Sequence, residues 1–357
     1  MIALPDSAMV KTTLVTLAIG AIGAAVAWLL SIPAPVLTGP ALLVSLASLF
    51  GVRTDIAPFL REVCFVILGV GTGAGFNRSA GTAIVTWPLA FVALAVGLAV
   101  TMVVCRIVLE RGFGFDRRSA ILAAAPGHLS FVMSLAADTR ADLGRVAVVQ
   151  SIRLLALTLL VPFAALAMGY PPIHIGMTPE TPLEPMPLLA LMAGGAALGF
   201  VLRRFRLPAP MVLGGMIVSS VTHVTEIVPG AVPAVVLVPA FMVLGALIGT
   251  RFSGMSLSAL LESFAAGVVA TLIAAFASAL AALPVAAALG FPLVHVLTAF
   301  APGGLETMIA LGAALGASPG FVVACHVIRL LILSVMIPFF VNGVPPGPQD
   351  RARQESS

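Results

Sequence analysis

The stretch "APGHLSFVMSLAADTRADLGRVAVVQSIRLLALTLLVPF" (125–163) aligns without a gap with "APGGLETMIALGAALGASPGFVVACHVIRLLILSVMIPF" (301–339). Sixteen of the 39 positions are identical, which exceeds what shared apolar composition would give. "FVILGVGTGAGF" (65–76) matches "FMVLGALIGTRF" (241–252) at the same offset. The sequence therefore predicts two copies of one unit, residues 1–169 and 188–341, joined by a Pro-rich linker at 170–187 and followed by a disordered tail at 342–357.

The composition of the chain decides its class. Hydrophobic residues make up 60% of the 357 residues and charged residues 9%, and the mean hydropathy is +1.16. A soluble domain carries about 25% charged residues. Apolar runs such as 14–30, 89–104 and 260–283 match the roughly 20 residues that a helix needs to cross the hydrocarbon core. The chain is predicted to be an all-α polytopic membrane protein.

The sequence disfavours nucleic-acid binding, metal binding and enzymatic activity. No basic cluster with interleaved aromatic residues is present, so no nucleic-acid partner is expected. The cysteines Cys64, Cys105 and Cys325 are scattered in apolar segments and indicate neither a disulfide framework nor a metal site. The five histidines lack the spacing of copper ligands. We therefore expect no enzymatic activity and no cofactor.

The arginines around the first Pro-Gly break bear on topology. Arg117 and Arg118 precede the break, whereas Arg140 and Arg145 follow it. Under the positive-inside rule they fall on one side only if the segment enters the membrane and returns. A re-entrant break gives five crossings per half, ten in all. Because five is odd, the second copy is then inverted, both termini lie in the cytoplasm and the linker lies outside. The alternative is six crossings per half, twelve in all, and a parallel repeat.

Each break could form half of a binding site. A helix that begins near the bilayer midplane presents free N–H groups that suit an anion, and broken backbone at that depth is tolerated where it lines a wet cavity. The alternative is that the breaks only kink packed helices. The predicted site residues are Pro126, Gly127, His128 and Ser130 from the first break, and Pro302, Gly303, Gly304, Glu306 and Thr307 from the second.

A pair of arginines occupies matched positions after the two breaks. Arg153 and Arg329 lie well inside apolar helices, where a lone charge costs at least about 2.5–3.5 kcal/mol. They could converge and hold an anionic substrate. Alternatively, each could cap carbonyl groups of the adjacent short helix or pair with Glu306 or Asp138.

Three further polar residues accompany this pair. Glu306 could carry a proton or bind Na⁺, or it could serve only as a helix-start residue. Gln150 and His326 are repeat mates that precede the two arginines by three residues and share their helix face. They are predicted to support the site. His326 could relay protons, or it could be a core histidine with a backbone partner.

The duplicated Pro-Gly motif followed by an arginine, and the segments "IPAPVLTGP" (32–40) and "LPAPMVLGG" (207–215), resemble the AbrB-type duplicated bacterial membrane proteins. That resemblance implies a bacterial inner-membrane location and, through the labels such proteins often carry, a role as regulator or ammonia monooxygenase. The dispersed histidines argue against the oxygenase label.

The sequence favours a secondary transporter for a small, anionic organic solute, with a membrane sensor that affects gene expression indirectly as the alternative. Membrane lipid and the solute are the expected partners, H⁺ or Na⁺ would be the coupling ion, and a homodimer is left open.

Overall fold

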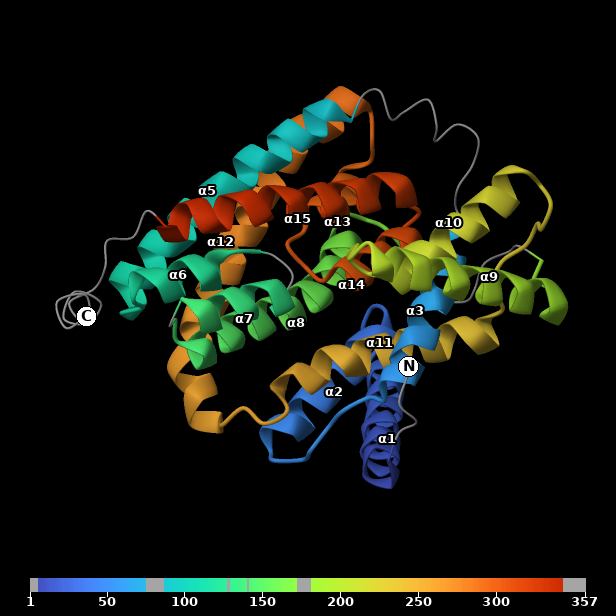
Figure 1. Cartoon of the computed structure of the whole chain (residues 1–357), viewed down its shortest axis with the longest axis horizontal. Coiled ribbons are helices and arrows are strands. Elements are labelled where there is room, and N and C mark those ends of the chain that lie inside the picture. Colours follow the sequence, from blue (N-terminus) through green and yellow to red (C-terminus); the bar gives the residue numbers. More distant parts are fainter. Residues whose placement is uncertain (1–5, 75–86, 127–128, 140, 172–180, 343–357) are drawn as a thin grey trace.

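The described chain is helical. The computed structural model describes residues 6–74, 87–126, 129–139, 141–171 and 181–342, which form 14 α-helices and one short 3₁₀ helix (Figure 1). Seven helices are long and apolar enough to cross a membrane, which makes this a multi-pass membrane protein, as the composition predicted. These are α1 (Ser7–Leu29), α5 (Pro88–Phe113), α8 (Leu143–Ala167), α9 (Pro185–Arg204), α11 (Ala234–Gly249) with η2 (Thr250–Phe252), α12 (Leu257–Leu289) and α15 (Pro319–Asn342).

Shorter helices fill the remainder of the described chain. An eight-residue helix followed by a ten-residue helix occurs twice, on either side of the Pro-Gly breaks. Helices of eight and ten residues are about 12 and 15 Å long, whereas the hydrocarbon core is roughly 30 Å thick. None of these short helices can therefore cross the core alone. The short helices are α2 (Pro35–Leu49), α3 (Pro58–Gly73), α6 (Arg117–Ala124), α7 (Leu129–Asp138), α10 (Pro210–Val224), α13 (Leu293–Phe300) and α14 (Leu305–Ala314).

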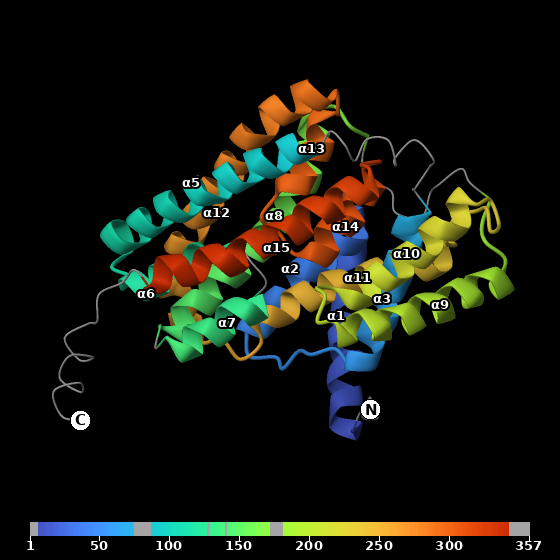
Figure 2. The same cartoon turned by 45° about the horizontal axis from the view of Figure 1, so that its top comes forward.

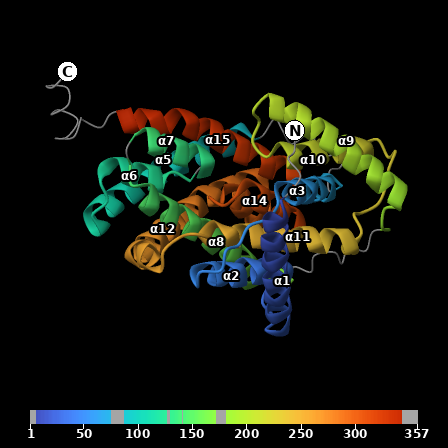
Figure 3. The ribbon, with the colours of Figure 1, turned by 60° about the horizontal axis from the view of Figure 1, so that its bottom comes forward.

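The helices assemble into two groups (Figures 1 and 2). Helices α1, α2, α3, α9, α10 and α11 pack on one another and are called the glycine bundle. Helices α5 to α8 and α12 to α15 pack on one another and are called the break bundle, because both Pro-Gly breaks belong to it. Figure 3 shows α1 at the margin of the glycine bundle, where it packs on α2 and α11. The closest backbone contacts between the two bundles involve α14 and α8, and buried side chains of both bundles share two hydrophobic clusters.

Close backbone crossings hold the glycine bundle together. A Cβ atom on Gly69 of α3 would collide with the carbonyl oxygen of Val212 in α10, and one on Gly245 of α11 would collide with that of Leu37 in α2. A Cβ atom on Gly23 of α1 would lie 2.5 Å from the carbonyl oxygen of Gly39 in α2. Between membrane helices such small residues allow the close backbone packing that replaces the hydrophobic driving force. These crossings therefore make the bundle a tightly fitted unit.

Two related turns lead into α2 and α10. Ala34 and Ala209 adopt left-handed backbone conformations, with φ angles of 52° and 45°, just before Pro35 and Pro210 begin their helices. Such conformations are uncommon for residues other than glycine, so each turn is held by its surroundings. Pro at the first helical position suits the fixed φ angle of a helix start. The segments "IPAPVLTGP" and "LPAPMVLGG" thus mark two equivalent helix entries.

Candidate functional site

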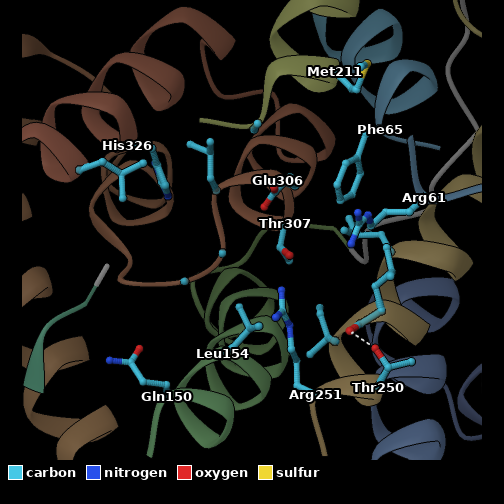
Figure 4. Close-up of a pocket in the computed structure, with 18 of the residues that line it drawn as sticks. Arg61, Phe65, Gln150, Leu154, Met211, Thr250, Arg251, Glu306, Thr307 and His326 are labelled. Atoms are coloured by element: carbon cyan, nitrogen blue, oxygen red, sulfur yellow. Dashed lines mark hydrogen bonds between the residues drawn. The ribbon is translucent and has the colours of Figure 1, made fainter. Parts of the chain in front are cut away.

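A cavity of about 700 Å³ lies where the two bundles meet (Figure 4). The break bundle contributes Pro126 of the first break and residues 302–307 of the second, together with side chains from α8 and α15. The glycine bundle contributes residues from α3, α9, α10 and α11. Both breaks therefore reach one cavity, which brings together residues far apart in the sequence.

The second break is held by Arg329. Its Nη1 atom donates to the carbonyl oxygen of Ala301 at 2.8 Å, and its Nη2 atom donates to that of Ala299 at 3.0 Å. The side chain is buried and lines the cavity. Ala301 follows directly on α13, so Arg329 satisfies carbonyl groups that the end of this short helix leaves without helical partners.

Arg153 holds the first break in the same way. Its Nη1 atom donates to the carbonyl oxygen of Ala123 at 3.5 Å, and its Nη2 atom donates to that of Ala125 at 3.2 Å and to Oε1 of Gln150. These acceptors are the repeat mates of those that Arg329 uses. Arg153 and Arg329 also line the same cavity. The two predicted arginines thus converge and cap carbonyl groups, whereas direct contact with a substrate stays a prediction.

The residues three positions earlier differ between the two breaks. Gln150 donates from Nε2 to the carbonyl oxygens of Leu122 at 2.8 Å and Ala125 at 2.9 Å. Its mate His326 instead bonds through Nδ1 to the carbonyl oxygen of Val322 in its own helix at 2.9 Å, and its buried Nε2 has no hydrogen-bond partner among the described residues. His326 thus has the backbone partner expected of a core histidine, and it also lines the cavity.

The start of α14 forms one wall of the cavity. Gly304 is the N-cap residue and supplies no side-chain cap, so the N–H groups of the first turn have no side-chain acceptor there. Glu306 and Thr307 lie in this turn, and Figure 4 shows both side chains pointing into the cavity. Within the described part of the chain Glu306 accepts no hydrogen bond and pairs with neither predicted arginine. The helix-start hydrogen bond, which was one of the two roles considered for Glu306, is therefore absent from the described contacts.

The predicted residues of the first break are only partly described. Pro126 lines the cavity. Gly127 and His128 lie outside the described residues. Ser130 belongs to α7, but its side chain, like that of Asp138, lies outside the described part of the structure. The second break is described in full, and Pro302, Gly303 and Gly304 all line the cavity.

Sequence reasoning missed the charged groups that the glycine bundle contributes. Arg61 at the start of α3 and Arg251 in η2 point into the cavity from the wall opposite Glu306 (Figure 4). Arg203 of α9 forms a salt bridge with Glu62 of α3, with 2.6 Å between Nη2 and Oε1. Their sequence signal was a charge at the end of an apolar helix, which the positive-inside rule explains equally well.

Comparison with known proteins assigns the chain to a family. The family model described as "Transition state regulatory protein AbrB" matches residues 36–344. The chain belongs to the AbrB family. This AbrB-family chain is also similar to "Uncharacterized protein YhjN" of Bacillus subtilis (strain 168), with 29% identity over 302 residues that cover 77% of this chain and 76% of that protein. Neither description gives a ligand. The described residues of the AbrB-family chain contain no group of three or more His, Cys, Asp or Glu side chains placed to hold a metal ion.

Proposed function

We propose that this AbrB-family protein is a secondary transporter that moves a small, anionic organic solute through the cavity between its two bundles. The observation that carries the proposal is that both Pro-Gly breaks line one cavity where the two bundles meet. Secondary transporters commonly place their substrate at the junction of two structural units, where interrupted helices expose backbone groups. A relative movement of the bundles would open the cavity to either side of the membrane.

The charge of the cavity wall supports an anion. The lining includes five arginines and the three acidic residues Asp55, Glu62 and Glu306, which leaves an excess of positive charge when all are ionised. Arg153 and Arg329 are buried, so water screens their charges poorly, and carbonyl caps do not neutralise them. The free end of α14 adds a positive helix terminus.

We infer that residues 1–169 and 188–341 form inverted repeats. The helix lengths support the repeat: 15 and 16 residues for α2 and α3 recur as 15 and 16 for α10 and α11, and the helices of eight and ten residues recur around each break. The inverted orientation rests on the arginines around the first break, which fall on one side only if the break is re-entrant. The crossing partners are reciprocal too, since α2 packs on α11 and α3 packs on α10. Five crossings per half with re-entrant breaks then give ten spans. Both termini lie in the cytoplasm of a bacterial inner-membrane protein, and residues 170–187 are external.

Transport is tested with purified protein in proteoliposomes and a panel of short-chain carboxylates, sulfonates and amino acids. We expect uptake of at least one compound above that of empty liposomes, driven by a H⁺ or Na⁺ gradient. Arg251→Gln should weaken the binding of that compound about tenfold, because hydrogen bonds to charged groups contribute about 1.5–3 kcal/mol. Arg53→Gln is the matched control, since Arg53 is exposed and does not line the cavity. Absence of uptake for the whole panel would refute the proposal.

A membrane sensor is the second candidate, and the regulatory description of the family favours it. A sensor would bind its ligand in the same cavity but would not release it on the other side. Stabilisation of the purified protein by a panel compound, without any uptake into proteoliposomes, would decide for the sensor. In either role we propose that the protein acts without catalysis and without a bound cofactor.

A further inference from the structure

Three charged side chains meet across the cavity. Glu306 projects from α14 in the break bundle, whereas Arg61 and Arg251 project toward it from α3 and η2 at the glycine bundle (Figure 4). Glu306 and Arg251 both line the cavity, and no salt bridge joins them among the described residues. The space between them belongs to the cavity, so a ligand in it would meet groups of both signs.

The other charged groups of the lining already have partners. Arg203 pairs with Glu62, Asp55 accepts the backbone N–H of Ile56 at 2.8 Å, and Arg153 and Arg329 donate to carbonyl groups of the breaks. Among the described residues, Arg61, Arg251 and Glu306 make neither a hydrogen bond nor a salt bridge. The protein therefore presents both unpaired guanidinium groups and one unpaired carboxylate to the same cavity.

A simple carboxylate ligand would satisfy only part of this arrangement. Its negative group would suit Arg61, Arg251 and the N–H groups at the start of α14, but Glu306 beside them would repel it. A ligand that also carries an ammonium group would place that group against Glu306. The half-buried Glu306 carboxylate would then gain the charged hydrogen-bond donor that the described protein does not supply.

We propose that the cavity binds an amino acid or a closely related amino-carboxylate, with its carboxylate toward Arg61 and Arg251 and its ammonium group on Glu306. This inference rests on the proposed transport function and adds to its substrate an ammonium group beside the carboxylate. The cavity has room for a side chain, and Phe65, Met211 and Leu154 supply apolar wall on either side of the charged groups. A net negative amino acid would also match the cationic excess of the lining.

The test compares matched ligands with and without an amino group. L-alanine is paired with propanoate, L-aspartate with succinate, and L-leucine with 4-methylpentanoate, and binding to detergent-purified protein is measured by thermal stabilisation and calorimetry. We expect at least one amino acid to bind about tenfold more tightly than its partner. Glu306→Gln should lose that preference, because it removes the negative charge that the ammonium group needs. Glu262→Gln is the control, since Glu262 is exposed on α12 and does not line the cavity.

The outcomes separate this inference from transport itself. The inference is overturned if the compounds without an amino group bind wild-type protein as tightly as the amino acids, or if Glu306→Gln leaves the preference intact. Uptake of succinate or propanoate into proteoliposomes would in that case still support transport of an anion. Unchanged elution and melting temperature of ligand-free Glu306→Gln establish that the variant is folded. Arg251→Gln, which should weaken both members of a pair, provides a second variant.

Discussion

Arg329 offers the sharpest test of how the breaks are built. Replacing it with Gln removes two charge-assisted hydrogen bonds, to the carbonyl oxygens of Ala301 at 2.8 Å and Ala299 at 3.0 Å. Hydrogen bonds to charged groups contribute about 1.5–3 kcal/mol each. The two bonds together would contribute about 3–6 kcal/mol to stability. The substitution also removes the cost of burying the guanidinium charge, which offsets part of that loss. We expect Arg329→Gln to lower the free energy of unfolding by about 2–4 kcal/mol.

The assay is reversible unfolding in a fixed detergent without any solute, with Arg53→Gln as the exposed control. Arg329→Lys should recover part of the loss, because an ammonium group keeps the charge but lacks the planar fork that reaches both carbonyl groups. If ligand-free Arg329→Gln is as stable as wild type, the capping interpretation is wrong. A variant that unfolds more easily yet keeps its full affinity for a solute would assign Arg329 to the frame of the site rather than to the ligand.

The remaining predictions concern packing, topology and the first break. Gly69→Ala should lower the free energy of unfolding by about 1–3 kcal/mol, because its Cβ atom would collide with the backbone of α10. Gly112→Ala is the control and should be neutral or stabilising, because a Cβ atom there meets no atom within 4 Å. Equal stability of the two variants would refute this packing. Cysteines introduced at Leu143 and Ala314 should react with an impermeant maleimide from opposite sides of the membrane, and labelling from one side would require the parallel repeat. Gln150→Leu should cost about 1–3 kcal/mol in the same unfolding assay, since two buried carbonyl groups lose a donor; an unchanged value would show that these bonds do not stabilise the break.

The sequence predicted the elements of this structure better than their assembly. The membrane class follows from composition, and the breaks at Pro126 and Pro302 follow from residues that cannot continue a helix. The matched arginines were found because a charge in an apolar helix is costly enough to need an explanation. All of these signals are local or depend on an internal alignment.

The grouping into two bundles depends on contacts that no local pattern specifies. Gly69 and Gly245 were visible as part of the repeat, but which helices they allow to cross is a property of the folded chain. Arg61 and Arg251 stand at helix ends, where the positive-inside rule already accounts for them. Their shared cavity with Glu306 emerges only when α3, η2 and α14 come together.

The internal sequence alignment separates two kinds of polar residue. Arg153 and Arg329 occupy equivalent positions and cap equivalent carbonyl groups, so the symmetric pair maintains the shape of both breaks. Glu306 has Ser130 as its repeat mate, and Arg61 has a leucine at the equivalent position. A structural role that both halves share explains why the same residue occurs at equivalent positions of the two halves. An asymmetric ligand instead needs binding groups that only one half supplies. The unduplicated charges are therefore where we expect ligand specificity to lie, and the duplicated arginines are where we expect structural stability to lie.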